Sequence, residues 1–206
     1  MRRAVALLSL LPLLPAGAAA QVLADAQGID SRIDGRTDSG PAPSATERLA
    51  RRLPAELLGY RRMGEAESLR QGSAVRYAPA DGERILVSVM VYASEDSGTP
   101  EEALQRASAE TEALAGTGRY RAVTAQALPP AATPALAEAA PGLRCTSFTL
   151  QPQQGRASAD GLCVALQSGH LVKVRVNSLS QADAGRAGRM AAEMAEAVGQ
   201  VFATAR

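Results

Sequence analysis

Alternating apolar and polar positions mark the strands of this chain, and the clearest run covers residues 84–93 (RILVSVMVYA). Ile85, Val87, Val89 and Val91 fall on one face of such a strand, and the opposite face is also mostly apolar. A strand that is apolar on both faces is typical of the middle of a sheet. We therefore expect this strand to be central, with both of its faces covered.

Similar but shorter runs predict the other strands, and turn residues separate them. The last three runs are joined by a polar turn at 154–156 and by Ser168-Gly169, which predicts antiparallel neighbours. In the final run, Val172, Val174 and Val176 are expected to point inward. The predicted strands are 59–69, 73–77, 84–93, 120–126, 143–151, 161–167 and 170–177.

Helical spacing and capping residues predict three helices. Thr99, Pro100 and Glu102 form the pattern of an N-cap, a first-turn proline and a capping box, so a helix should run from Pro100 to about Ala115. A shorter helix over 46–57 should break at Pro54. The last helix is expected to begin at Ser180, with one apolar stripe made of Ala187, Met190, Met194, Ala197, Val201 and Phe202.

These elements predict a single α+β domain over residues 46–206, with a mainly antiparallel sheet of about six to seven strands covered by helices. The segments Leu53–Arg61, Ser73–Gly82 and Arg84–Tyr92, taken in this order with the later elements, resemble the PsbP-like α/β/α sandwich superfamily. The resemblance implies an antiparallel sheet between helices, and a binding or assembly role without catalytic residues. It rests on element order, so it carries over no site residue.

The first twenty residues have the three parts of a secretory signal peptide. Arg2 and Arg3 precede an uncharged apolar run over 4–14, and small residues follow at 18–20. Cleavage is expected after Ala20, or alternatively after Ala18. A membrane span needs about 20 apolar residues, and this run is too short. We therefore expect a periplasmic or secreted mature protein without a transmembrane segment.

Two further segments have the composition of linkers. Residues 21–45 are rich in Gly, Asp, Ser and Pro, which predicts a flexible tether. Asp30, Asp34 and Asp38 recur within it every fourth residue, whereas a calcium loop places its acids at every second residue. Residues 127–142 hold four prolines, and this loop is either a contact for a partner or a plain connection.

Charge and metal-ligand content exclude several functions. The chain has 22 basic and 21 acidic residues, and removal of Arg2 and Arg3 leaves 20 basic residues. No basic excess remains for nucleic-acid binding. His170 is the only histidine, so any triad or imidazole metal site would have to be built around it. We assign no catalytic residue, no cofactor and no metal.

Cys145 and Cys163 are each nine residues from position 154, at the middle of a predicted hairpin. A simple hairpin places such residues opposite each other, at a separation that suits a disulfide. An exported protein meets an oxidising compartment, so we expect this bridge to form. The alternative is a reactive thiol pair, although the spacing is not that of a CxxC motif.

A ligand or partner face is the remaining candidate site. Several basic residues on predicted strands could gather on one sheet face as an anion site, and tyrosines flank two of them and could line a shallow pocket. The alternative is an ordinary solvated strand face. The sequence thus indicates an exported non-enzymatic protein, a periplasmic binding or envelope-assembly accessory factor. A small envelope-acting hydrolase and an inhibitor-like or structural envelope protein are the alternatives. The residues of the candidate face are Tyr60, Arg61, Arg62, Arg76, Tyr77, Lys173 and Arg175.

Overall fold

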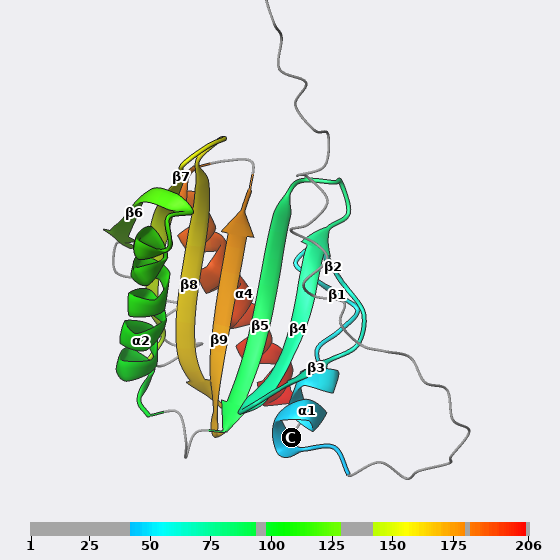
Figure 1. Ribbon diagram of the computed structural model, residues 1–206. Helices are drawn as coiled ribbons and strands as arrows, with labels where there is room; N and C mark the ends of the chain where they lie inside the picture. Colours follow the sequence, from blue (N-terminus) through cyan, green and yellow to red (C-terminus); the bar gives the residue numbers. More distant parts are fainter. Residues whose placement is uncertain (1–41, 94–97, 129–141, 180–181, 205–206) are drawn as a thin grey trace, which may run out of the picture. The chain divides into compact units, whose positions relative to one another are not determined.

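The strands form one sheet in the computed structural model, which describes residues 42–93, 98–128, 142–179 and 182–204 (Figure 1). Within these ranges the sheet has nine strands in the order β1-β2-β4-β5-β9-β8-β7-β6, with β3 paired to β4. Every neighbouring pair is antiparallel. The predicted α+β class is confirmed, and the sheet is larger than the six to seven strands expected.

The described part of the chain is one compact unit that contains helices beside the sheet. The helical elements are α1 (Ala45–Arg51), α2 (Pro100–Ala113), the 3-10 turn η2 (Leu114–Thr117) and α4 (Ala184–Thr204). The strands are β1 (Glu56–Leu57), β2 (Tyr60–Arg62), β3 (Glu67–Leu69), β4 (Gly72–Pro79), β5 (Ile85–Ala93), β6 (Tyr120–Ala127), β7 (Arg144–Pro152), β8 (Ser158–Gln167) and β9 (His170–Ser178).

Short strands at one edge account for the larger sheet. The helix expected over 46–57 ends at Arg51, before Pro54, and its last residues form β1 instead. Leu58 and Gly59 both have positive φ and make a two-residue hairpin turn into β2. The single strand expected over 59–69 is divided into β2 and β3, because Gly64 also has positive φ and turns the chain between them.

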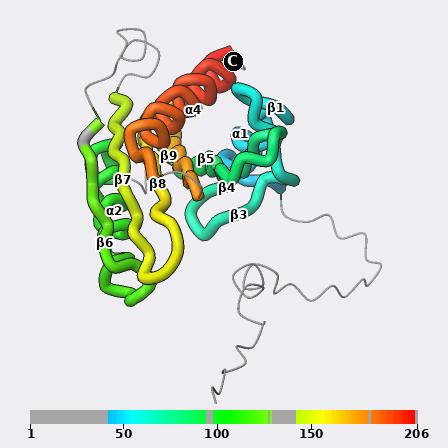
Figure 2. Tube along the Cα trace, turned by 90° about the horizontal axis from the view of Figure 1, so that it is seen from above, coloured from blue at the N-terminus to red at the C-terminus, as the bar shows by residue number. Residues whose placement is uncertain are grey.

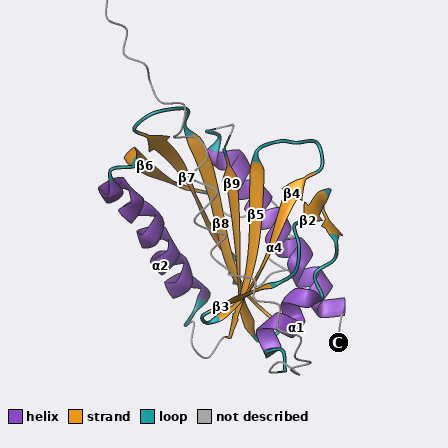
Figure 3. Ribbon diagram, turned by 45° about the vertical axis from the view of Figure 1, so that its right-hand side comes forward, coloured by secondary structure: helices purple, strands orange, loops and turns teal. Residues whose placement is uncertain are grey.

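The sheet lies between helices, with α4 on one side and α2 on the other (Figure 3). We call the side that α4 and α1 cover the α4 face, and the other side the α2 face. The α4 face holds the main core, in which alternate residues of the central strands are fully buried. This confirms the inward valines predicted for β5 and β9, and the buried residues include Val87, Val89, Val91, Val172, Val174 and Val176.

Small residues allow α4 to lie close to this face. A Cβ atom on Gly161 of β8 would stand 2.0 Å from the backbone oxygen of Ala187, so the two backbones nearly touch there. Because the contact is made through alanines, the predicted stripe is shifted: Met190, Ala197 and Val201 are only half-buried beside it. The buried residues of α4 are Ala184, Ala187, Gly188, Ala191, Met194, Ala195, Val198 and Phe202.

The α2 face is covered over only part of its width by described helices. The capping box at Thr99 and Glu102 forms as predicted, and α2 packs over β7 and β8. Leu86 and Met90 of β5 are half-buried on this side, so this face of β5 is less buried than its α4 face. Under α2, the apolar layer consists of Ala103, Ala107, Phe148, Leu150, Leu162, Val164 and Leu171.

The centre of the sheet joins segments that are distant in the sequence. Strand β5 pairs with β9 over its whole length, from Ile85 opposite Ser178 to Ala93 opposite His170. The β5–β9 pairing therefore joins two parts of the sheet, strands β1–β5 from the first half of the domain and strands β6–β9 from the second half. This pairing confirms the central position predicted for β5.

Several predictions fall on residues outside the described ranges: the signal peptide 1–20, the tether up to residue 41, its three aspartates, most of the proline-rich loop, and Ser180. Ser44 lies at the tether's end and caps α1. Helix α4 begins at Ala184, where the Asp183 carboxylate accepts a hydrogen bond of 2.8 Å from the Arg186 N–H. Within the described ranges, no helix is long and apolar enough to cross a bilayer.

Candidate functional site

A cavity of about 550 Å³ opens on the α4 face, between α4 and the β1–β2 hairpin. Both α4 and β1 can be followed in the view from above (Figure 2). Cavities of this size are typical of sites that hold small ligands or several side chains of a partner. We call it the α4 groove, and it is lined by Leu58, Tyr60, Val87, Met190, Glu193, Met194, Glu196, Ala197 and Gln200.

The mouth of the groove is formed by an apolar residue in an unfavourable conformation. Leu58 has φ 51° and its side chain is 55% exposed. The first position of a turn of this kind favours Asn, Asp or Gly, and a left-handed conformation costs other residues about 1–2 kcal/mol. Leu58 therefore contributes neither turn propensity nor core burial. Its contribution is apolar surface at the groove.

The floor of the groove is apolar and contains one hydroxyl. Val87 and Met194 are buried at its base, and Met190 is half-buried beside them. The Tyr60 hydroxyl lies 4.0 Å from the Met190 sulfur, which is only a weak hydrogen-bond acceptor. Burial raises the pKa of Tyr60, with Arg186 opposing the shift, so the hydroxyl is a neutral donor at neutral pH.

Two carboxylates stand on the α4 side of the groove. Glu193 is exposed and Glu196 is half-buried, and their spacing of three residues places them on one side of the helix. Within the described ranges, neither carboxylate has a salt-bridge partner. Glu83, by contrast, lies 3.3 Å from the Arg186 guanidinium. The groove therefore combines an apolar floor with an acidic rim.

The residues of the face predicted from sequence are divided between the two sides of the sheet. Arg76 and Tyr77 are neighbours on β4, and neighbouring strand residues point to opposite faces. Tyr77 is fully buried on the α4 face, where its hydroxyl donates to the Pro54 carbonyl at 2.9 Å. Tyr60 and Arg62 share that side, and Arg62 donates to the Leu53 and Gly64 carbonyls. Arg61, Arg76, Lys173 and Arg175 belong to the α2 face.

On the α2 face, three of these four basic residues are engaged within the chain. Arg76 lies 2.9 Å from Glu67, and the Lys173 ammonium is 5.4 Å from the centre of the Tyr92 ring. Burial lowers the pKa of Lys173, with Glu110 opposing the shift. Arg175 donates to Asp160 through two nitrogens. These internal contacts leave less of the positive charge for a ligand, so we regard the groove as the better candidate site.

Asp160 is the buried centre of the polar network on this face. Its side chain is almost fully buried on β8 and accepts hydrogen bonds from Arg175 and Asn177 of β9. Burial raises the pKa of Asp160, and the hydrogen bonds and charge of Arg175 oppose this shift. The carboxylate thus depends on Arg175 for the stability of its charged form.

His170 is the first residue of β9, directly after the Ser168-Gly169 turn, and is not part of the groove lining. Its Nδ1 is 2.9 Å from the Ser168 carbonyl oxygen, a contact within the turn itself. Over the described ranges, no group of three or more His, Cys, Asp or Glu side chains is placed to hold a metal ion.

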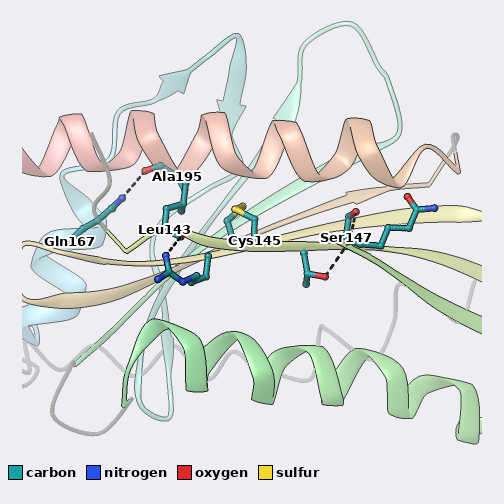
Figure 4. The surroundings of a disulfide bond; sticks show 9 residues. Leu143, Cys145, Ser147, Gln167 and Ala195 are labelled. Carbon is teal, nitrogen blue, oxygen red and sulfur yellow. Dashed lines mark hydrogen bonds between the residues drawn. A yellow bond between two sulfur atoms is a disulfide. The ribbon is translucent and has the colours of Figure 1, made fainter. Parts of the chain in front are cut away.

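Cys145 and Cys163 form the predicted disulfide, with an S–S distance of 2.04 Å (Figure 4). They are direct partners in the register of β7 and β8, and Cys163 is buried in the core below α4. The neighbouring Gln167 donates a hydrogen bond of 2.8 Å to the Ala195 carbonyl of α4. The bridge links β7 to β8. In the sheet, β9 lies between β8 and β5, the central strand that contributes Val87 to the groove.

Reduction of this disulfide is expected to lower the free energy of unfolding by about 3 kcal/mol, because the bridge closes a loop and restricts the unfolded chain. The sequence separation of its cysteines is 18 residues. Urea unfolding with and without reductant measures the change. The double variant C145A/C163A, which cannot form the bridge, serves as the control and should unfold like the reduced protein, with or without reductant. Equal stability of the oxidised and reduced forms would contradict the prediction.

The groove was missed by sequence reasoning, which did not single out Leu58, Glu193 or Glu196. One signal was available: Leu58 stands before Gly59 in a short turn, where a polar residue would fit better. The position of the two glutamates beside apolar residues could be recognised only after the orientation of α4 was known.

Comparison with known proteins gives no match, either among protein-family models or among curated proteins.

Proposed function

We propose that this chain is an exported, non-enzymatic accessory protein that binds an apolar segment of a partner in the α4 groove. The supporting observation is the lining of the groove, in which Leu58, Tyr60 and Met190 present apolar surface to solvent. The signal-peptide pattern of residues 1–20 supports export. The resemblance to PsbP-like sandwiches favours the same class, a periplasmic binding or envelope-assembly factor.

The side chains of the groove suit this role. Removal of apolar surface from water stabilises a complex by about 25 cal/mol per Å². The side chains of Met190 and Met194 are unbranched and flexible, so they adapt to partners of different shape. The Tyr60 hydroxyl is a donor with only a thioether nearby, and it would meet an acceptor on the bound segment.

Leu58→Asn tests the proposal without weakening the fold. Asn adopts the left-handed conformation readily, so the free energy of unfolding should stay unchanged or rise by up to about 1 kcal/mol. A neutral amphipathic peptide of about 14 residues, with leucines at helical spacing, is the probe. Its affinity, measured by fluorescence anisotropy, should fall about tenfold, which corresponds to about 1.4 kcal/mol of lost apolar contact.

Leu166→Asn is the matched control, because Leu166 is also an exposed leucine (47%) but lies on β8, away from the groove lining. This variant should bind the peptide like the parent protein. The proposal fails if Leu58→Asn binds with unchanged affinity, or if both variants lose affinity to the same extent.

A further inference from the structure

We infer that the occupant of the α4 groove is a basic amphipathic segment of a partner protein, with apolar side chains on the floor and Arg or Lys side chains at Glu193 and Glu196. This inference rests on the proposed function and adds the chemistry of the partner. It is carried by the charges on the rim of the groove.

The exposed acids of the domain fall into two groups, those with a salt bridge within the chain and those with none among the described residues. Glu47, Glu67, Glu83 and Glu101 each form a salt bridge within the chain. Glu193 and Glu196 form none among the described residues, although both line the groove. The two charged residues of the groove lining are thus both acidic, and a cationic side chain on the molecule that binds would be complementary to them in charge.

The pair also opposes the stability of its own helix. Like charges one turn apart destabilise a helix by about 0.2–0.5 kcal/mol. Burial is the main cause of the raised pKa of Tyr60, and Arg186 opposes the shift. Glu193 adds to this pKa shift less than Glu83 and Asp81 do. A cationic side chain on the rim would replace this repulsion by charge-assisted hydrogen bonds.

The shape and charge of the groove favour a protein segment over a lipid. The lining residues of α4 run from Met190 to Gln200, which corresponds to about 15 Å of helix at a rise of 1.5 Å per residue. An elongated segment with apolar residues at helical spacing would follow this length. A fatty-acid carboxylate or an anionic headgroup at the rim would be repelled by both glutamates.

The test uses the full mature chain and three peptides with one leucine pattern, flanked by arginine, glutamine or glutamate. We expect the arginine peptide to bind about tenfold more tightly than the glutamine peptide. The glutamate peptide should bind most weakly. The advantage of arginine should decrease as the salt concentration rises, because the rim is open to solvent.

The double variant E193Q/E196Q should lose the preference for arginine and retain its affinity for the glutamine peptide. The matched control is E110Q/E112Q, which removes the same charge from α2 on the other face of the sheet. It should keep the preference.

The outcomes separate this inference from the proposed function. If the three peptides bind equally and Leu58→Asn weakens all of them, the groove binds apolar segments but the charge preference is overturned. Tighter binding of the glutamate peptide, or of oleate, would overturn it as well. If no peptide binds, the proposed function and the inference fail together.

Discussion

The substitution Gly161→Ala is expected to lower the free energy of unfolding by about 3 kcal/mol, at the upper end of the usual cost of overpacking. The added Cβ would lie 2.0 Å from the Ala187 oxygen, 2.3 Å from the Ala187 carbonyl carbon and 2.7 Å from the Gly188 nitrogen. All three are backbone atoms, so no change of rotamer relieves the contact. Helix α4 must move away from β8, which opens the main core.

Gly116→Ala is the control for this prediction. Gly116 lies in η2, and a Cβ atom there would meet nothing within 4 Å. An alanine in such a position restricts the unfolded chain and should leave stability unchanged or raise it by up to about 1 kcal/mol. Urea unfolding of both variants gives the comparison. A similar stability for Gly161→Ala and the parent protein would show that the approach of α4 to the sheet is less close than described.

The substitution Arg175→Met is expected to lower the free energy of unfolding by about 3 kcal/mol at neutral pH, because it leaves a buried carboxylate without its cation. The Asp160 side chain is only 2% exposed and retains just the Asn177 hydrogen bond in this variant. Met resembles the apolar part of the Arg side chain in length, so the loss of packing is small. Chemical denaturation at neutral pH measures the effect.

The pH dependence of the stability of Arg175→Met shows whether the buried charge of Asp160 causes the loss. In the parent protein, burial already raises the pKa of Asp160 above its unfolded value of about 3.9. The contribution of this carboxyl to stability is thus complete below the unfolded pKa and is lost as pH rises through the folded pKa. Removal of Arg175 raises the folded pKa further, so the variant should recover much of its lost stability on acidification to about pH 5.

The double variant R175M/D160N removes the charge and should recover most of the stability at neutral pH, because an amide is far less costly to bury than a carboxylate. Its stability should also depend less on pH than that of Arg175→Met. If the single variant is equally destabilised at acidic and neutral pH, the burial of an unpaired charge is not the cause.

The alternation of apolar residues was sufficient to predict the central strands and their inward faces. Strand β5 and its partner β9 have strong patterns of this kind, and the hairpin spacing of Cys145 and Cys163 fixed their pairing. Local signals of this sort act over a few residues. They therefore predict strands, caps and turns well.

The candidate site was harder to predict because it depends on how distant elements pack. Helical spacing grouped Met190 and Ala197 with the core stripe of α4. The close contact at Gly161 turns the alanines of α4 toward the sheet and leaves these two residues beside the groove. On β4, the prediction assigned Arg76 and Tyr77 to one candidate ligand face because of their charge and aromatic ring. Neighbouring residues of a strand point to opposite faces of the sheet, so the two side chains are in fact separated.

The pairing of β5 with β9 also limits how early the sheet can form while the chain is synthesised from its N-terminus. Strand β5 lies near the middle of the sequence, but β9, the strand that pairs with its second edge, is the last strand of the described residues. Until β9 arrives, the most apolar strand of the protein offers an unpaired backbone edge. Completion of the sheet therefore requires a strand that is distant from β5 in the sequence, as expected for a topology rich in long-range contacts.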